Sequence, residues 1–71
     1  MKRRELIGRI GESARIAGLT WALVRQGSAH EVWRLGDRQI AIPRHREINE
    51  LTAQAIVRAL EAELGEGWWR A

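Results

Sequence analysis

The chain of 71 residues contains no cysteine, and this absence excludes both a disulfide framework and a cysteine-ligated zinc site. No apolar run approaches the roughly 20 residues that a membrane-spanning helix requires. Acidic residues do not cluster, and the two histidines lack the spacing of metal ligands, so the sequence predicts neither a bound metal nor another cofactor. Internal repeats and low-complexity segments are also absent.

The length predicts a single domain, residues 1–71, close to the lower size limit for a self-supporting core. We expect the core to lie within about residues 4–64, followed by a short C-terminal tail over residues 66–71. The segment from Met1 to Glu5 carries basic residues without a long apolar stretch behind it, which is not the pattern of a secretion signal. We therefore expect a soluble, cytoplasmic protein with no membrane partner.

Charge is distributed unevenly along the chain. Residues 1–46 contain ten Lys and Arg against four acidic residues, whereas residues 47–71 contain two against five. A basic body with a mildly acidic C-terminal part fits a phosphate-binding surface. The same arginines could simply solvate a small domain, and charge alone does not choose between these two interpretations.

Five segments with regular hydrophobic patterning follow one another. Apolar residues recur at helical spacing over residues 3–17 and again over residues 51–64. Between them, residues 20–26, 30–35 and 39–42 have the composition or alternation of strands, and short turns separate them. Short turns favour antiparallel pairing. The predicted fold is α+β, a two-layer α-β-β-β-α sandwich with both helices on one face of a three-stranded antiparallel sheet.

Glycine and asparagine mark the predicted ends of the helices. Gly18 and Gly65 stand where C-terminal caps are expected, and Asn49 stands at an N-cap position. Gly8 and Gly11 fall inside the first helix, and each weakens it by roughly 1 kcal/mol relative to alanine. Either these small residues let the helix approach the sheet closely, or the first turns of the helix are loose.

Alternation in the middle strand predicts where His30 points. Glu31 and Trp33 fall on one side of this strand, and His30 and Arg34 fall on the other. If the larger apolar side faces the helices, His30 and Arg34 face outward and Glu31 lies at the rim of the buried side. A one-residue bulge after Gly27 would invert this arrangement.

Two segments resemble a known protein family. Residues 21–30 (WALVRQGSAH) follow the first helix, and residues 40–45 (IAIPRH) end the third strand. Their order and spacing are similar to those of the HicA toxins, also grouped as YcfA-like proteins, and the resemblance covers roughly residues 4–64. It implies a fold like the double-stranded-RNA-binding domain. It also implies the activity of an mRNA interferase, which is an endoribonuclease toxin of a type II toxin–antitoxin pair.

The resemblance implies a catalytic residue as well. The family's catalytic histidine follows a glycine turn at the start of the second strand, and its counterpart here is His30. One residue separates glycine from histidine in the family pattern, whereas two separate Gly27 from His30. Either Ser28 takes the place of the glycine or the turn is one residue longer.

The chemistry of RNA cleavage fits these residue types without reference to the family. RNA carries its own nucleophile, the 2′-hydroxyl, and one imidazole acting as general base or general acid contributes about 10²–10⁴-fold. Nearby arginines would stabilise the phosphate in the transition state, and His45 is a candidate second acid–base residue. We therefore expect metal-independent cleavage of RNA and none of DNA. The residues expected to contact RNA are Ser28, Arg25, Arg34, Arg44, His45 and Arg46.

A toxin requires a partner that restrains it. The resemblance implies a HicB-type antitoxin encoded alongside, and a basic face invites an acidic partner that would exclude RNA by occupying the same surface. We expect a hetero-oligomer with this antitoxin. Such a complex would regulate its own promoter through the DNA-binding part of the antitoxin.

Two other interpretations remain open. The same fold and arginines suit a double-stranded-RNA-binding module without catalysis. Alternatively, the chain is an interaction subunit that docks through Trp68 and Trp69, two adjacent indoles that either pack back on the domain or belong to an interface. Trp21 and Trp33 are expected to pack in the core and on the sheet face, and not to stack on bases.

Overall fold

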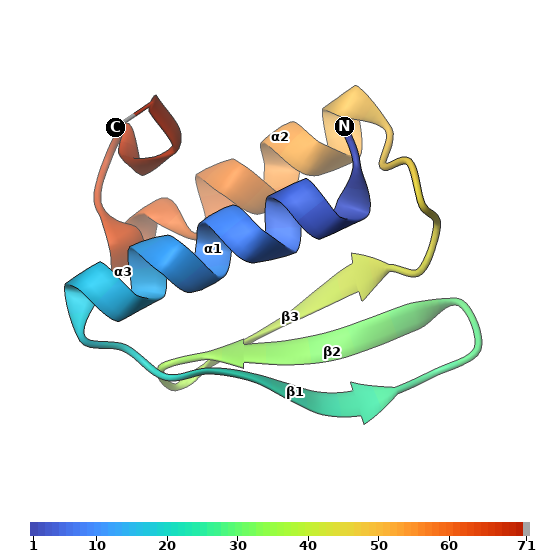
Figure 1. Cartoon of the computed structure of the whole chain (residues 1–71), viewed down its shortest axis with the longest axis horizontal. Helices are drawn as coiled ribbons and strands as arrows, with labels where there is room; N and C mark the ends of the chain where they lie inside the picture. Colours follow the sequence, from blue (N-terminus) through green and yellow to red (C-terminus); the bar gives the residue numbers. More distant parts are fainter. Residues whose placement is uncertain (71) are drawn as a thin grey trace.

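The structure, a computed structural model, describes residues 1–70 and consists of a helical layer packed on one face of a sheet (Figure 1). The sheet has the order β1-β2-β3, and both neighbouring pairs are antiparallel. The α+β class and the α-β-β-β-α order are therefore confirmed. No helix within the described residues is long and apolar enough to cross a membrane. The elements are α1 (Arg3–Ala17), β1 (Trp21–Gln26), β2 (His30–Leu35), β3 (Arg38–Pro43), α2 (Glu50–Ala59), α3 (Glu61–Leu64) and the 3₁₀ helix η1 (Trp68–Arg70).

Local capping signals mark the end of α1 and the start of α2. Gly18 adopts the left-handed conformation with φ of 73°, and its N–H bonds to carbonyls in the last turn of α1, as a glycine C-cap does. The Asn49 side chain accepts a 2.8 Å hydrogen bond from the Leu51 N–H, so the predicted N-cap of α2 is also confirmed.

The single helix expected over residues 51–64 is wrong, because the helix is interrupted at Leu60. Leu60 has φ −85° and ψ −2°, and the Glu63 N–H bonds to its carbonyl at 3.1 Å, which tightens the chain locally into a 3₁₀-type turn. The Leu60 side chain is fully buried. Leu60 is therefore buried like the other core positions of this segment although the helix is interrupted there, and hydrophobic periodicity does not register the interruption. In the sheet, β1 begins one residue later than expected and β3 extends one residue further at each end.

The C-terminal tail belongs to the core. Trp68 is only 7% exposed, and its indole N–H donates a 2.9 Å hydrogen bond to the Val57 carbonyl. Trp69 lies against α1, where the Arg9 guanidinium is 3.7 Å from the centre of its ring. Trp68 and Trp69 thus pack back on the domain, and the core reaches beyond residue 64; Ala71 lies outside the described residues. The buried apolar residues are Leu6, Ile10, Ala14, Leu35, Ile42, Ile48, Ala53, Ile56, Leu60 and Trp68.

Gly11 lets α1 approach the sheet closely. A β-carbon at Gly11 would lie 3.1 Å from Cδ1 of Trp21, whereas one at Gly8 would meet nothing within 4 Å. Trp21 in turn stacks on Trp33, with ring centres 4.7 Å apart and planes 18° from parallel. Both indoles pack against the core, as expected. Of the two interpretations of these glycines, close approach is therefore correct for Gly11.

Candidate nucleic-acid interface

His30 is the first residue of β2 and is exposed to solvent. It stands opposite Pro43 at the end of β3. Its neighbour Glu31 is buried on the helical side, and because successive residues of a strand point to opposite faces, His30 points to the outer face of the sheet. The predicted outward orientation of His30 is therefore confirmed.

Two arginines share this outer face with His30. Arg34 lies four residues further along β2 and has the same orientation, and Val32 stands between them. Arg25 of β1 is the direct cross-strand partner of Val32, which makes it a diagonal neighbour of both His30 and Arg34. All three polar side chains are exposed. The outer face thus presents one imidazole and two guanidinium groups around Val32.

A β-bulge in β1 places Arg25 on that face. The register runs from Leu23 opposite Trp33 directly to Arg25 opposite Val32, so Val24 is the extra residue. Without the bulge, Arg25 would fall on the same side of the sheet as Leu23, which pairs with Trp33. The sequence left open a bulge after Gly27, which would have exchanged the two faces of β2. The observed bulge lies at Val24 of β1, so the alternation of β2 is intact and only the side chains of β1 after Val24 change face.

The turn that leads to His30 is held against the end of β3. The Gly27 N–H donates to the His30 carbonyl at 2.8 Å, and the Arg44 N–H donates to the Ala29 carbonyl at 3.0 Å. The Arg44 guanidinium adds a 2.8 Å hydrogen bond to the Gly27 carbonyl. A β-carbon at Gly27 would lie 2.9 Å from the His30 carbonyl oxygen, so this tight turn requires glycine. Arg44 therefore anchors the turn through both its backbone N–H and its side chain.

A buried carboxylate fixes the start of β2 from the inside. Glu31 is 7% exposed and accepts hydrogen bonds from three donors: the Arg3 guanidinium, the Gln26 amide at 3.2 Å and the Trp33 indole at 3.1 Å. Arg3 also donates from Nε to the Pro43 carbonyl at 3.0 Å. The first turn of α1 is thereby joined to β2 and β3 directly behind His30. Burial of the carboxylate is tolerated because its oxygens are hydrogen-bonded.

The predicted RNA-contact residues divide between two neighbouring surfaces. Arg25 and Arg34 lie on the outer sheet face with His30, and Ser28 is exposed in the turn before it. Arg44 and Arg46 instead line a groove where α1 begins. His45, exposed between these two arginines, joins the surfaces along the chain.

Sequence reasoning missed three basic residues of this region and the role of Glu31, which it placed only at the rim of the buried side. Lys2, Arg3 and Arg4 line the same groove as Arg44 and Arg46, and Glu31 organises the layer beneath His30. The basic run at the start of the chain was a visible signal. Its position beside residues 44–46 was not, because only long-range pairing brings the two segments together.

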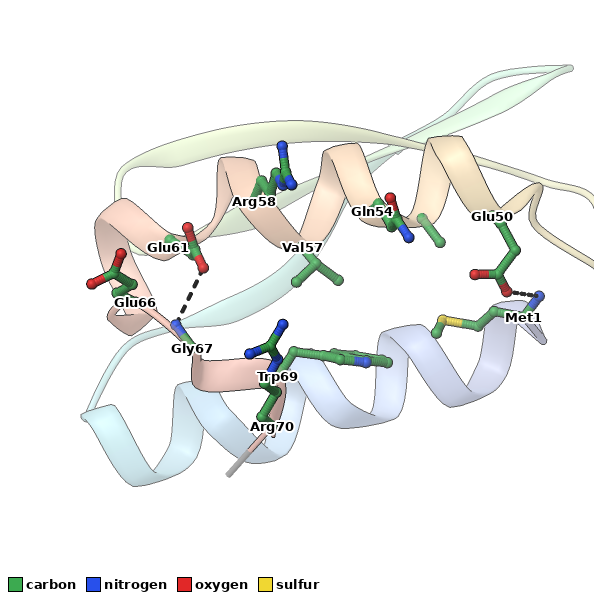
Figure 2. Close-up of a pocket in the computed structure, with 11 residues that line it drawn as sticks. Met1, Glu50, Gln54, Val57, Arg58, Glu61, Glu66, Gly67, Trp69 and Arg70 are labelled. Carbon is green, nitrogen blue, oxygen red and sulfur yellow. Dashed lines mark hydrogen bonds and ion pairs between the residues drawn. The ribbon is translucent and has the colours of Figure 1, made fainter.

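A second hollow lies on the helical layer between α2, the tail and the first residue of the chain (Figure 2). Its lining mixes acids and bases with the half-buried Trp69, and an ion pair joins the Met1 amino group to Glu50 at 3.7 Å. Charges of both signs face this hollow, so it favours no single class of charged ligand. Residues 44–46 and His30 do not line it.

Within residues 1–70, no group of three His, Asp or Glu side chains is placed to hold a metal ion. Metal-independent cleavage of RNA stays a prediction, and a cleavage assay with EDTA present would test it.

Comparisons of the chain with protein-family models, with curated proteins and with solved structures find no match.

Proposed function

We propose that the chain is the toxin of a type II toxin–antitoxin pair and acts as an mRNA interferase of the HicA (YcfA-like) kind. The observation that carries this proposal is the exposed His30 imidazole on a sheet face that it shares with Arg25 and Arg34. No acidic residue stands in the outward positions of the paired strands among the described residues. Such a face attracts a polyanion and offers it an imidazole that can donate or accept a proton.

The proposed reaction uses the 2′-hydroxyl of RNA as its nucleophile. A bond forms between the 2′-oxygen and phosphorus, and the bond from phosphorus to the 5′-oxygen breaks. His30 either accepts the proton from the 2′-hydroxyl or donates one to the leaving 5′-oxygen, and water exchanges the other proton. The products are a 2′,3′-cyclic phosphate and a 5′-hydroxyl. DNA lacks the nucleophile and is not a substrate.

The arginines have separate roles in this proposal. Arg25 and Arg34 flank the phosphate on the sheet face and stabilise charge in the transition state. Arg44 holds the turn before His30 through the Gly27 carbonyl, so it positions the imidazole while remaining close to the RNA. His45 is exposed and follows Arg44, and it contacts RNA or serves as a second acid–base group.

The partner that belongs with this function is an acidic HicB-type antitoxin, in a cytoplasmic hetero-oligomer. By covering the outer face it would exclude RNA from His30. A neighbouring gene for a small acidic protein with a DNA-binding segment, whose co-expression abolishes the toxicity of this chain, would support that part of the proposal. Undiminished toxicity in the presence of every neighbouring product would oppose it.

The test of the proposal is cleavage by the purified chain, freed of any partner, with EDTA present. The expected result is that RNA is cut to fragments with 2′,3′-cyclic phosphate ends and that DNA of the same sequence survives. His30→Ala should lose cleavage and still bind RNA, while Arg58→Ala, which changes an exposed arginine of α2, should cut like the parent. Dependence on an added divalent metal would contradict the proposal.

The same experiment separates the alternative of a non-catalytic double-stranded-RNA-binding module. That module would bind RNA through the same arginines, and the parent protein would leave RNA intact. The third interpretation, docking through the tryptophan tail, loses part of its basis because Trp68 is buried and bonded to Val57 within the domain.

A further inference from the structure

A basic groove lies at the end of the molecule where α1 begins and β3 ends, which is also the end that carries the β1–β2 turn (Figure 1). We call it the α1 groove. Its lining contains five basic side chains and a single acidic one: Lys2, Arg3, Arg4, Arg44, Arg46 and Glu47. The groove is separate from the outer sheet face, because none of Arg25, His30 and Arg34 lines it.

Long-range backbone pairing builds the α1 groove. Lys2 and Glu47 form an antiparallel bridge, and the Arg3 N–H donates to the Arg46 carbonyl at 2.8 Å. The Ile48 N–H donates to the Met1 carbonyl at 2.7 Å, and the Ile48 side chain is buried in the core. Basic side chains from the two segments are therefore held side by side on a fixed backbone.

Most of the positive charge in the α1 groove is unpaired. Arg3 is bonded to the Glu31 carboxylate, but the ion pairs of the described residues include none made by Lys2, Arg4 or Arg46. The single acid, Glu47, lies 3.3 Å from the amino group of Met1. Cations gathered without counter-ions repel one another, and a bound anion would relieve that repulsion.

Backbone geometry adds to the attraction for an anion. Lys2 occupies the N-cap position of α1 and makes no side-chain cap. The Arg4 N–H, in the first turn, has no acceptor among the hydrogen bonds of residues 1–70. First-turn N–H groups and the positive end of the helix dipole favour phosphate, and here they coincide with the unpaired side chains.

We propose that the α1 groove binds a second phosphate of the RNA strand whose scissile phosphate lies at His30. The placement of the scissile phosphate at His30 rests on the proposed ribonuclease function. His30 stands opposite Pro43. Arg46 follows Pro43 by three residues, so the two are separated by at most about 10 Å at the 3.3 Å rise per residue of an extended chain. One strand can therefore reach both places. Arg4 and Arg46 bind and align the phosphate backbone of the RNA and take no part in proton transfer.

The test uses an Arg4→Ala/Arg46→Ala double variant, with Arg58→Ala as the matched control. Arg4, Arg46 and Arg58 are all exposed, so circular dichroism and thermal melting should match the parent in each case. Binding of a fluorescent 2′-O-methyl octaribonucleotide, which cannot be cleaved, is measured across a range of salt concentrations. The plot of log affinity against log salt should become less steep in the double variant by about 0.7 per lost contact, and stay unchanged in the control.

A probe with one phosphate separates the two subsites. A 2′-O-methyl dinucleoside monophosphate fills only one subsite at a time, so its binding beside His30, followed by the NMR shifts of the His30 imidazole, should be the same in the parent and in the double variant. On a cleavable octamer, the double variant should raise KM and leave kcat near the parent value, because it removes binding that ground state and transition state share.

The outcomes separate this inference from the ribonuclease proposal. An unchanged salt dependence in the double variant overturns the second subsite, even if the parent cleaves RNA. An equal loss of the one-phosphate probe's binding beside His30 also overturns it, because the two subsites would then be one. A reduced salt dependence in the double variant, together with a parent protein that never cleaves RNA, supports the phosphate subsite and overturns the ribonuclease.

Discussion

Removing the Glu31 carboxylate is the perturbation whose consequence the structure defines most closely. Glu31→Ala deletes an acceptor that serves Arg3, Gln26 and Trp33. The Arg3 side chain is 23% exposed and keeps its bond to the Pro43 carbonyl. It therefore remains largely covered by protein after its counter-ion is gone.

The magnitude follows from the burial of both partners. Breaking a buried ion pair by removing one member costs about 3–5 kcal/mol. Because Arg3 retains some access to water and one hydrogen bond, we expect the lower end, about 3 kcal/mol. A domain of this size loses roughly 4–8 °C in Tm for each kcal/mol, so the melting temperature should fall by on the order of 15 °C. Glu31→Gln keeps the shape and one acceptor oxygen, and it should cost about 1–2 kcal/mol.

The assay is urea unfolding of a double-mutant cycle formed by Glu31→Ala, Arg3→Ala and their combination. Each single change leaves a buried partner unpaired, whereas the double change removes both. We expect the pair to show a coupling free energy of about 1–3 kcal/mol. Additive effects, or a Glu31→Ala protein within about 1 kcal/mol of the parent, would refute the view that this carboxylate secures the start of β2.

Three further changes test the packing and the turn. Trp68→Ala should lower the free energy of unfolding by about 3–5 kcal/mol. Trp68→Phe loses the bond to the Val57 carbonyl but keeps most of the burial, so it should cost about 1 kcal/mol for that bond. Equal stability of Trp68→Ala and the parent would exclude the tail from the core. Gly8→Ala should stabilise the protein by up to about 1 kcal/mol, since a methyl group there meets no neighbour, and a lower Tm would contradict this. Gly27→Ala should destabilise the protein and slow RNA cleavage, because the added carbon displaces the His30 carbonyl; parental cleavage by this variant would count against a tight turn as the support of His30.

Features governed by neighbouring residues were predictable from the sequence. The glycine cap at Gly18, the asparagine cap at Asn49 and the turns between strands act within a few residues, so their chemistry is visible in the chain. The alternation from His30 to Leu35 predicted which side of β2 faces the helices, since burial of one face leaves a period of two. The outward direction of His30 followed from that pattern.

Features governed by contacts between distant residues were not predictable. The interruption at Leu60 depends on its place in the core, and the bulge at Val24 depends on the register with β2. Neither changes the hydrophobic pattern of its own segment. The α1 groove is of the same kind, because its two halves are separated by some forty residues and meet through long-range backbone pairing around Lys2 and Glu47.

The most direct test of the central claim is the rate of a single turnover on saturating RNA with EDTA present, compared between the parent and His30→Ala. The account predicts that the rate in His30→Ala falls by about 10²–10⁴-fold, while its affinity for a 2′-O-methyl oligoribonucleotide stays at the parent value. Cleavage by His30→Ala at the parental rate would contradict the assignment of proton transfer to this imidazole.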